Sequence, residues 1–273
     1  MSRRGQTDGG ASRQGKQRRA GFSERVLEPL AAPGLTLILL IAWQLAVPVL
    51  GLSEFVLPTP AQILARMAKD HALLLTHARV TLLEVLGGFA LAVAAGIPTA
   101  LLIFYSRLFE RAVYPLLIAE QAIPKVALAP LVVLYLGYGW APKIFLAFLI
   151  GYFPVVVSTV VGLQSLDVAM VSLVRSMGAS GWQTFVKIRL PAALPNIFGG
   201  LKLAIGLAVI GAVIGEYVAA ERGLGYLQLQ ANSQFDTTLN FASVVTISLL
   251  GVFLFALLRV IERWVVFRRE PAR

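Results

Sequence analysis

Four long stretches of the chain carry no formal charge, and they dominate its pattern of apolar and polar positions. They cover residues 29–53, 85–106, 144–166 and 237–258. About 20 consecutive apolar residues are enough for a helix to cross the hydrocarbon core of a bilayer. The stretches lack the strict alternation of apolar and polar residues that strands of a membrane β-barrel show. We therefore predict a transmembrane helix in each of them, with the second running from about residue 80 to 104.

Two further apolar stretches are interrupted by single charges. Glu120 and Lys125 lie within residues 112–137, and Lys202 lies within residues 192–217. Counting both stretches as spans gives six crossings. The predicted fold is an all-α, polytopic membrane protein whose six transmembrane helices occupy residues 29–267.

The third predicted span has an unusual content of proline. Pro115, Pro124 and Pro130 lie in "YPLLIAEQAIPKVALAPLVVLYLG". Proline removes a backbone hydrogen bond, which membrane helices tolerate mainly where neighbouring helices or water satisfy the freed groups. This pattern predicts a broken helix that lines a cavity.

Ionisable residues inside spans are candidates for function. Lys125 either faces an anionic solute or pairs with Glu120, and Lys202 is interpreted as an anchor at the membrane surface. Glu216 is either a gate or a structural partner near the outer end of the fifth span. The residues predicted to line a translocation path are Pro124, Lys125, Pro130 and Glu216.

The composition supports an integral membrane protein. Hydrophobic residues make up 58% of the 273 positions and charged residues 14%, and the mean hydropathy is +0.77. Soluble domains contain about 25% charged residues, so too little polar surface remains to cover these helices as the core of a soluble protein. Cysteine is absent, which excludes disulfides and thiolate chemistry.

The net charge of +10 is distributed in a way that indicates topology rather than nucleic-acid binding. Lys and Arg concentrate in the N-terminal tail, near residues 107–111, in the loop at about 163–191 and at the C-terminal end, whereas the alternate loops, to which we assign Lys143, hold few. Positive residues favour the cytoplasmic side, which places the 163–191 loop and both termini there. Residues 1–28 are predicted to be a disordered basic tail that sets topology or binds anionic lipid. Residues 268–273 form a second cytoplasmic tail.

The sequence offers no catalytic or metal-binding motif. It contains no GxxxxGK[ST] run for cradling phosphates. His71 and His77 lie on a predicted external loop with only Asp70 nearby, a poor ligand set for zinc. We expect no cofactor, no metal and no enzymatic activity in this chain.

Two local patterns predict helix starts and close packing. Thr59-Pro60 can open a short amphipathic helix at the membrane surface, since proline is tolerated in a first turn. The Gly211–Gly215 pair has the GxxxG spacing that permits close helix crossing in membranes.

The loop between the fourth and fifth spans contains signals for two short helices. Asp167 can cap a helix that ends at Gly178, and Ser180 can cap a second helix over residues 181–188. Pro191 then opens the fifth span. These signals fit either an ordinary surface linker or a rigid bend beneath the membrane.

The spacing within this loop resembles a known family. Gly178 is followed by nine residues and then by Ile188-Arg189-Leu190-Pro191, within "RSMGASGWQTFVKIRLPAALPNIFGGLKLAIG". This segment is similar to the motif of inner-membrane permeases of ATP-binding-cassette (ABC) importers, especially those for sulfonates, taurine, nitrate or thiamine precursors. The stretches "FVLPTPAQIL", "IPKVALAPLVVLYLGYG" and "GLGYLQLQANSQFDT" resemble the same subgroup. One departure is Ser172, which stands where the family motif begins with Glu.

The resemblance implies a permease subunit in a bacterial inner membrane, which pairs with a second copy and forms the path for a small solute. Cytoplasmic ABC ATPase subunits would dock on the bend, and a periplasmic or lipid-anchored binding protein would deliver the solute. Whether the pair is a homodimer or a heterodimer stays open. The residues of the ATPase-coupling loop are then Ser172, Leu173, Arg175, Met177, Gly178, Ala179, Ser180, Trp182, Phe185, Ile188, Leu190 and Pro191.

Within this loop, the large apolar residues are expected to be exposed and to contact the ATPase, because aromatic residues and Met are enriched at interfaces. They are Leu173, Met177, Trp182 and Phe185. Arg175 and Lys187 would pair with acidic residues of the partner or face lipid headgroups.

An autonomous secondary transporter or channel is the alternative, and a structural scaffold is a third possibility. Ion coupling would require carboxylates within the spans, and the apparent candidates are Glu120 and Glu216 alone. The transported solute is not determined by the sequence.

Overall fold

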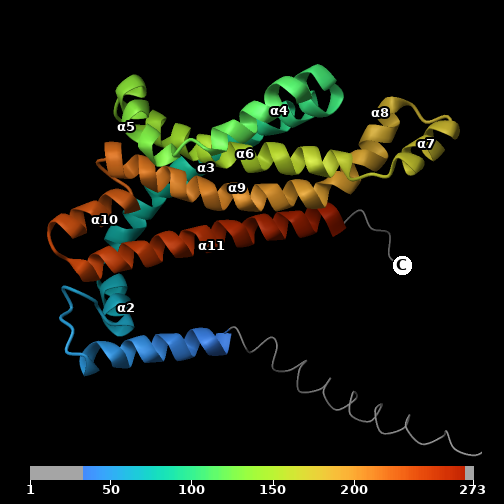
Figure 1. Ribbon diagram of the computed structural model, residues 1–273. Helices are drawn as coiled ribbons and strands as arrows, with labels where there is room; N and C mark the ends of the chain where they lie inside the picture. Colours follow the sequence, from blue (N-terminus) through green and yellow to red (C-terminus); the bar gives the residue numbers. More distant parts are fainter. Residues whose placement is uncertain (1–32, 268–273) are drawn as a thin grey trace, which may run out of the picture. The chain divides into compact units, whose positions relative to one another are not determined.

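A computed structural model describes residues 33–267 of the protein. Within these residues, the only regular secondary structure is helical (Figure 1). The all-α fold class is therefore confirmed. The two predicted tails, 1–28 and 268–273, lie outside the described residues.

The chain divides into two compact units, at Ala65 and Arg66. The first contains the apolar helix Pro33–Val49 and the start of α2 (Pro60–Lys69). A capping box opens α2: the Gln62 side chain accepts a hydrogen bond from the Thr59 N–H at 2.8 Å, and Thr59 Oγ1 accepts one from the Gln62 N–H at 3.3 Å. The prediction that Thr59-Pro60 starts a short helix is confirmed.

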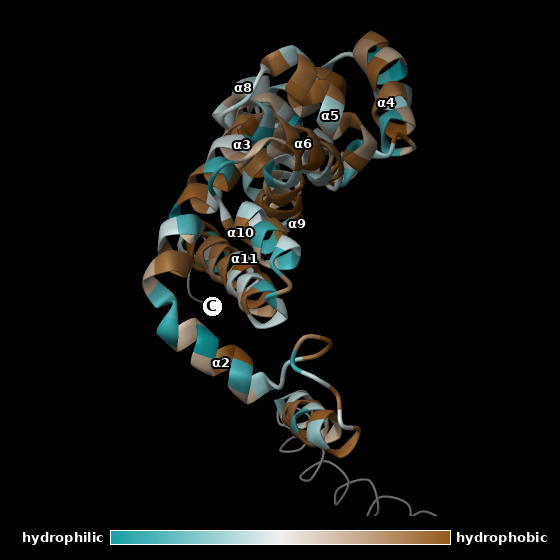
Figure 2. Ribbon diagram, turned by 90° about the vertical axis from the view of Figure 1, so that its left-hand side faces the viewer, coloured by the Kyte–Doolittle hydropathy of each residue, from teal (hydrophilic) through white to brown (hydrophobic). Residues whose placement is uncertain are grey.

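The second unit contains four helices that are long and apolar enough to cross a membrane. These are α3 (His71–Tyr105), α6 (Trp140–Gln164), α9 (Leu190–Ala219) with the turns before it, and α11 (Thr237–Phe267). Hydrophobic residues dominate their surfaces, whereas α10 (Leu224–Ser233) is more polar (Figure 2). The second, fourth, fifth and sixth predicted spans are confirmed as helices of spanning length. The helix Pro33–Val49 is shorter, so the first crossing stays a prediction.

The third predicted span is broken, as its prolines indicated. It consists of α4 (Arg107–Gln121) and α5 (Lys125–Leu136), whose axes differ by 102°. The break falls at Pro124, which is extended and precedes α5. Pro115 and Pro130 lie inside α4 and α5 without ending either helix. With this bent pair counted as one span, the described residues supply up to five crossings.

Helices α6 and α9 lie antiparallel and side by side along most of their length (Figure 1). Glycines make this close approach possible. A Cβ on Gly200 would lie 2.8 Å from the Pro154 carbonyl, and one on Gly211 would lie 2.6 Å from Ala147 Cα. On the α6 side, a Cβ on Gly162 would lie 2.9 Å from the Ala193 carbonyl. The close packing predicted from the Gly211–Gly215 spacing is confirmed, and its partner is α6.

Helix α3 packs against both α6 and α9. A Cβ on Gly88 would lie 2.8 Å from the Ile144 carbonyl, so the backbones of α3 and α6 also touch. Val85, Ala147 and Ile205, from α3, α6 and α9, are buried in one apolar cluster with residues of α11. The three helices thus form a rigid core whose two ends carry the functional features described below.

The close approach of α6 and α9 predicts a large difference between two glycine substitutions on one helix. Gly211→Val would force the Cβ into the α6 backbone and should destabilise the protein by about 1–3 kcal/mol, as overpacking typically does. Gly206→Val is the matched control, because a Cβ at this position would meet no atom of a neighbouring element within 4 Å. Thermal stability of the detergent-solubilised protein, measured by size exclusion after heating, checks this. Equal losses for the two variants would contradict the packing.

Candidate functional site

The loop after α6 forms a rigid bend between two capped helices. Asp167 Oδ1 accepts a hydrogen bond from the Ala169 N–H at 2.9 Å and caps α7 (Val168–Ser176). At its other end, the Gly178 N–H donates to the Arg175 carbonyl at 3.0 Å and the Ala179 N–H donates to the Val174 carbonyl at 3.3 Å. This is the Schellman arrangement, and Gly178 has the positive φ of 87° that it requires.

A second cap follows the bend immediately. Ser180 and Gln183 form a capping box: the Ser180 N–H donates to the Gln183 side chain at 2.9 Å, and the Gln183 N–H donates to Ser180 Oγ at 3.2 Å. The caps predicted for Asp167, Gly178 and Ser180 are all confirmed. The bend is therefore held by hydrogen bonds on both sides of Gly178.

The second short helix does not end where the sequence predicts. Helix α8 (Gly181–Thr184) passes through a π-helical turn, Phe185–Arg189, directly into α9. Pro191 lacks an N–H to donate, and its ring would crowd the carbonyl four residues earlier in an α-helix. The wider π turn accommodates it. The prediction of a separate helix over residues 181–188 is wrong, and the bend is continuous with the fifth span.

The apolar side chains around the bend differ in exposure. Met177 is 79% exposed and Trp182 is 73% exposed, and Leu173 is also exposed. Phe185 is only partly exposed, because its ring lies 6.0 Å from that of Tyr105 and packs on an apolar cluster that includes Leu163. Its prediction as an exposed residue is wrong: this side chain faces the bundle.

Among the other residues assigned to the bend, the polar and small ones near its tip are exposed. These are Ser172, Arg175 and Ser180. Ala179, next to Gly178, is half-buried, as are Ile188, Leu190 and Pro191 at the junction with α9.

Arg189, which the sequence prediction omitted, attaches the bend to the bundle. Its Nη1 donates to the Leu163 carbonyl at 3.0 Å, and its guanidinium lies 4.6 Å from the Phe104 ring. Leu163 is in the last turn of α6, where carbonyls have no helical partner and a cation is favoured. Arg189 therefore ties the start of α9 to the ends of α3 and α6.

The opposite end of the bundle contains a buried ion pair. The Lys143 ammonium of α6 contacts Glu84 Oε1 of α3, and the side chains are 6% and 0% exposed. Gly215 of α9 provides the space, since a Cβ there would lie 2.8 Å from Lys143 Cα. Charges within an apolar bundle require such pairing.

Glu216 is the centre of a hydrogen-bond network beside this pair. Its Oε1 accepts from the Thr81 hydroxyl at 2.6 Å, and its Oε2 accepts from the Gly225 N–H at 2.5 Å. Thr81 Oγ1 also accepts from the Leu224 N–H at 2.9 Å. Glu216 thus caps the N-terminus of α10, where a carboxylate is favoured. Glu216 is predicted to be either a gate or a structural partner, and these contacts match the structural partner.

Glycine is required next to this carboxylate. A Cβ on Gly223, whose φ is 123°, would lie closer than 3 Å to the Glu216 carboxylate. The Gly223 N–H also lies 3.0 Å from His77 Nδ1, and the His77 ring stacks on Tyr226. Residues 220–225 are therefore fastened to α3 by backbone as well as side-chain contacts.

Two residues of this network are misplaced by the sequence prediction. The prediction assigns Lys143 to an external loop. It also leaves Glu84 out of the carboxylates within the spans, for which it names Glu120 and Glu216. Both assignments are wrong. Glu84 lies inside the predicted second span, and an acidic residue at such a position is itself the available signal of a buried partner.

Lys125 and Lys202, the two cations predicted to lie within spans, are also paired. Lys125 forms a salt bridge with Glu120 at 2.9 Å across the break between α4 and α5. Lys202 forms one with Glu262 of α11 at 2.9 Å, so it has a specific partner beyond the anchoring predicted for it. Lys125 and Glu216 therefore belong to different polar clusters. Pro124 and Pro130 are exposed.

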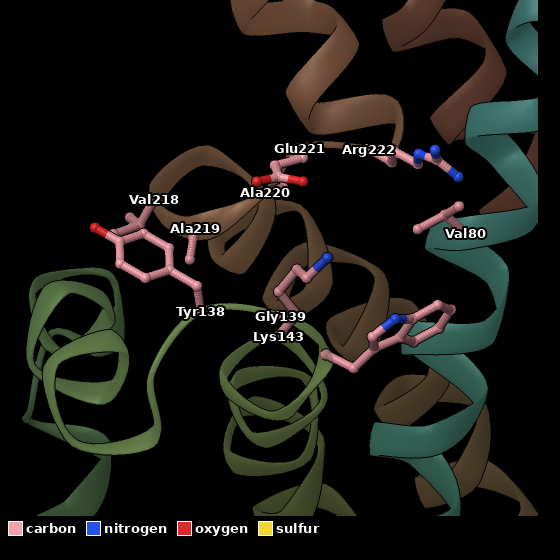
Figure 3. Close-up of a pocket in the computed structure, with 10 residues that line it drawn as sticks. Val80, Tyr138, Gly139, Lys143, Val218, Ala219, Ala220, Glu221 and Arg222 are labelled. Atoms are coloured by element: carbon pink, nitrogen blue, oxygen red, sulfur yellow. The ribbon is translucent and has the colours of Figure 1, made fainter.

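A cavity of about 570 Å³ opens next to Lys143. The turn before α6 contributes Tyr138 and Gly139, and the first residue of α6 contributes Trp140. The segment Val218–Arg222 also lines the cavity (Figure 3). Glu221 lies across the cavity from Tyr138, and the Arg222 side chain extends towards Val80 (Figure 3). The cavity therefore borders the buried network that fastens residues 220–225.

These features define a multi-pass, α-helical membrane protein with a capped bend at one end and a polar cavity at the other. Residues 73–270 match the family model described as "Binding-protein-dependent transport system inner membrane component". The chain belongs to this family, the permeases of binding-protein-dependent ABC importers.

Several curated relatives support this membership over most of their length. The chain is 39% identical to the formylaminopyrimidine transport permease protein ThiX of Halalkalibacterium halodurans, covering 88% of this chain and 95% of the relative. It is 38% identical to the riboflavin transport system permease protein RibX of Chloroflexus aurantiacus, with 87% and 89% covered. Identity to the putative aliphatic sulfonates transport permease protein SsuC of Bacillus subtilis is 29%, with 84% of each covered.

The fold is also found in solved structures. A chain of the MetNI methionine ABC transporter, in inward-facing conformations, superposes with a TM-score of 0.60 at 20% identity. The match covers 74% of this chain and 99% of that one. At this identity the likeness establishes a shared helical arrangement.

The buried Lys143–Glu84 pair predicts that removing its cation costs more stability than removing the cation of a more exposed pair. Lys143→Met leaves Glu84 buried without a cation and should cost about 3–5 kcal/mol of stability, as breaking a buried pair does. Lys202→Met is the comparison: its pair with Glu262 is about one-fifth exposed, so water solvates the remaining carboxylate in part and we expect a smaller loss than for Lys143→Met. The measurement is thermal stability of the detergent-solubilised variants. The double variant Glu84→Gln/Lys143→Met should recover part of the loss, and equal losses for both single variants would count against the pairing.

Proposed function

We propose that the chain forms the translocation path of an importer, together with a second copy, and that it couples transport to ATP hydrolysis by a separate cytoplasmic ABC ATPase. The observation that carries this proposal is the capped bend at Gly178, continuous with the fifth span. The chain itself hydrolyses no ATP; the ATPase activity belongs to the partner subunit.

The bend has the physical properties that a coupling element needs. Leu173, Met177 and Trp182 offer exposed apolar contacts at its surface, and large side chains of this kind are enriched at interfaces. The caps on both sides of Gly178 make the bend stiff. A displacement imposed on it by the ATPase would therefore move α9 without being absorbed by a flexible linker.

Two contacts would pass this displacement to the other helices. Phe185 packs against Tyr105 at the end of α3, and Arg189 holds the Leu163 carbonyl at the end of α6. A movement of the bend would then shift the ends of three spans together. Such a change drives transport only if ATP and the solute each bind the two conformations of the transporter, before and after the movement, with different affinities.

Ser172 bears on the strength of ATPase docking. Its exposed hydroxyl stands where the family motif has a carboxylate, so any ion pair made by that carboxylate is missing here. Arg175 and Lys187 are the exposed cations next to the bend. We propose that they and the apolar contacts supply the docking energy instead.

The solute is proposed to belong to one of the small-molecule classes of the related permeases and their subgroup: a sulfonate such as taurine, nitrate, or a vitamin precursor. A periplasmic or lipid-anchored binding protein would deliver it. Lys125, Pro124 and Pro130 at the broken α4–α5 pair remain proposed path residues, as does Glu216.

The proposed orientation can be tested with single cysteines, because the chain contains none. Met177→Cys at the bend should react with a membrane-impermeant maleimide only after the cells are permeabilised. Tyr138→Cys, at the other end and 84% exposed, should react in intact cells after outer-membrane permeabilisation alone. The gel shift of the labelled protein reports both. The reverse pattern would place the bend outside the cytoplasm and end the coupling proposal.

The coupling role predicts a specific effect at Gly178. A β-branched residue is strongly disfavoured at φ 87°, so Gly178→Val should deform the bend. In the complex with its ATPase and binding protein in proteoliposomes, we expect loss of at least about tenfold in stimulated ATP hydrolysis, given about 1–3 kcal/mol of backbone strain.

Gly181→Val is the matched control for this experiment. Gly181 lies in the first turn of α8 with an ordinary φ, and a Cβ there would meet no atom of a neighbouring element within 4 Å. This variant should keep most of the stimulated activity, and both variants should insert in the membrane like the wild type. Wild-type stimulation in Gly178→Val would refute the assignment.

A further inference from the structure

The cavity beside Lys143 has the size and lining of a site for a small molecule. Its volume of about 570 Å³ lies within the range of about 300–1,000 Å³ that ligand pockets occupy. Two aromatic side chains, Tyr138 and Trp140, share its wall with charged residues from the segment after α9. A wall of aromatic faces with a few polar groups is typical of sites that orient an organic ligand.

The charges in the cavity leave it without a net preference for anions. The Lys143 ammonium is neutralised by Glu84. Glu221 and Arg222 are exposed to the cavity, and within the part of the chain that the structure describes neither forms an ion pair. One carboxylate and one guanidinium therefore remain available to a ligand. A small sulfonate or nitrate would pair with the Arg222 guanidinium alone and would leave Glu221 and both aromatic rings without a partner.

Both aromatic side chains keep a large exposed surface. Trp140 is 49% exposed and Tyr138 is more exposed still. The Lys143 ammonium lies 5.8 Å from the Trp140 ring, which holds the indole next to the buried network. A flat ring is the ligand shape that stacks best on such a surface.

We propose that this cavity binds a planar nitrogen heterocycle during transport, with the ring stacked on Trp140. Glu221 accepts hydrogen bonds from N–H groups on the edge of the heterocycle, and Arg222 donates to its carbonyl or ring-nitrogen acceptors. The inference rests on the proposed transport function and deepens it: among the solute classes left open above, it selects the heterocyclic vitamin precursors over nitrate and simple sulfonates, which have neither a flat ring nor an N–H group for Glu221.

The cavity is continuous with a segment that is attached to α3, so ligand binding there would affect that attachment. Its Val218–Arg222 wall leads directly into Gly223 and Leu224, whose N–H groups are held by His77 and Thr81. A ligand bound to Glu221 and Arg222 therefore acts on the segment that Glu216 fastens to α3.

Equilibrium dialysis of the full chain in lipid nanodiscs tests the proposal. The heterocyclic probes are riboflavin and formylaminopyrimidine, and the anionic probe is methanesulfonate. We expect saturable binding of at least one heterocycle and no saturable binding of methanesulfonate. Trp140→Ala should weaken heterocycle binding about tenfold, in line with the alanine-substitution cost of stacking contacts, whereas Trp140→Phe keeps an aromatic face and should stay within about threefold of the wild type.

Further variants separate recognition from general damage. Glu221→Gln and Arg222→Gln should each weaken binding by about tenfold, the cost of losing a hydrogen bond to a charged group. Trp264→Ala, at an exposed tryptophan of α11 that does not line the cavity, is the matched control and should bind like the wild type. Thermal stability of every variant shows that it is folded.

Several outcomes would overturn the proposal. They are no saturable binding of either heterocycle, saturable binding of methanesulfonate in preference to both, or heterocycle binding that Trp140→Ala leaves unchanged. The assay contains no ATPase, so these outcomes leave the coupling role of the bend untouched. Conversely, wild-type stimulation of ATP hydrolysis in Gly178→Val would refute the coupling role of the bend without changing the dialysis result.

Discussion

Close contact between the backbones of α6 and α9 is the constraint on which the rest of this structure depends. In lipid, helices gain little from burying apolar side chains, because the surrounding acyl chains are equally apolar, so association depends on packing. Glycines at positions such as 162, 200 and 211 let the two helices touch along most of their length. The same contact places Lys143 beneath Gly215 and brings its ammonium to Glu84. Without it, neither the buried ion pair nor the cavity next to it would have its present geometry.

The polar groups inside the bundle form clusters that join particular helices to one another. Glu216 accepts hydrogen bonds from the Thr81 hydroxyl and the Gly225 N–H, and Thr81 accepts one from the Leu224 N–H, which fixes the segment after α9 against α3. The Lys143–Glu84 pair joins α3 to α6 within the same region. A charge in this environment is stable only with its partner, so these contacts fix one arrangement of the three helices. The proposed solute cavity borders this region.

The two ends of the bundle are linked by the same helices. At the bend, Arg189 and Phe185 connect the start of α9 to the ends of α6 and α3. At the cavity, Glu216 and Lys143 lie on the far ends of α9 and α6. In the proposed mechanism, the ATPase acts on one end and the solute on the other, and three tightly packed helices carry the effect between them. A stiff core suits this task because packed helices move as units rather than deforming continuously.

Sequence alone determined the features that depend on neighbouring residues. Apolar runs predicted six spans, of which four are confirmed as helices of spanning length. Pro115, Pro124 and Pro130 predicted a broken third span, and Asp167, Gly178 and Ser180 predicted the bend, because hydropathy, proline geometry and helix caps act within a few positions. Only the tertiary structure decided that Lys143 is buried against Glu84, that Phe185 faces the bundle, and that Trp140 and Arg222 share a cavity. Each of these depends on distances between segments far apart in the chain, which helix packing sets and no local pattern encodes.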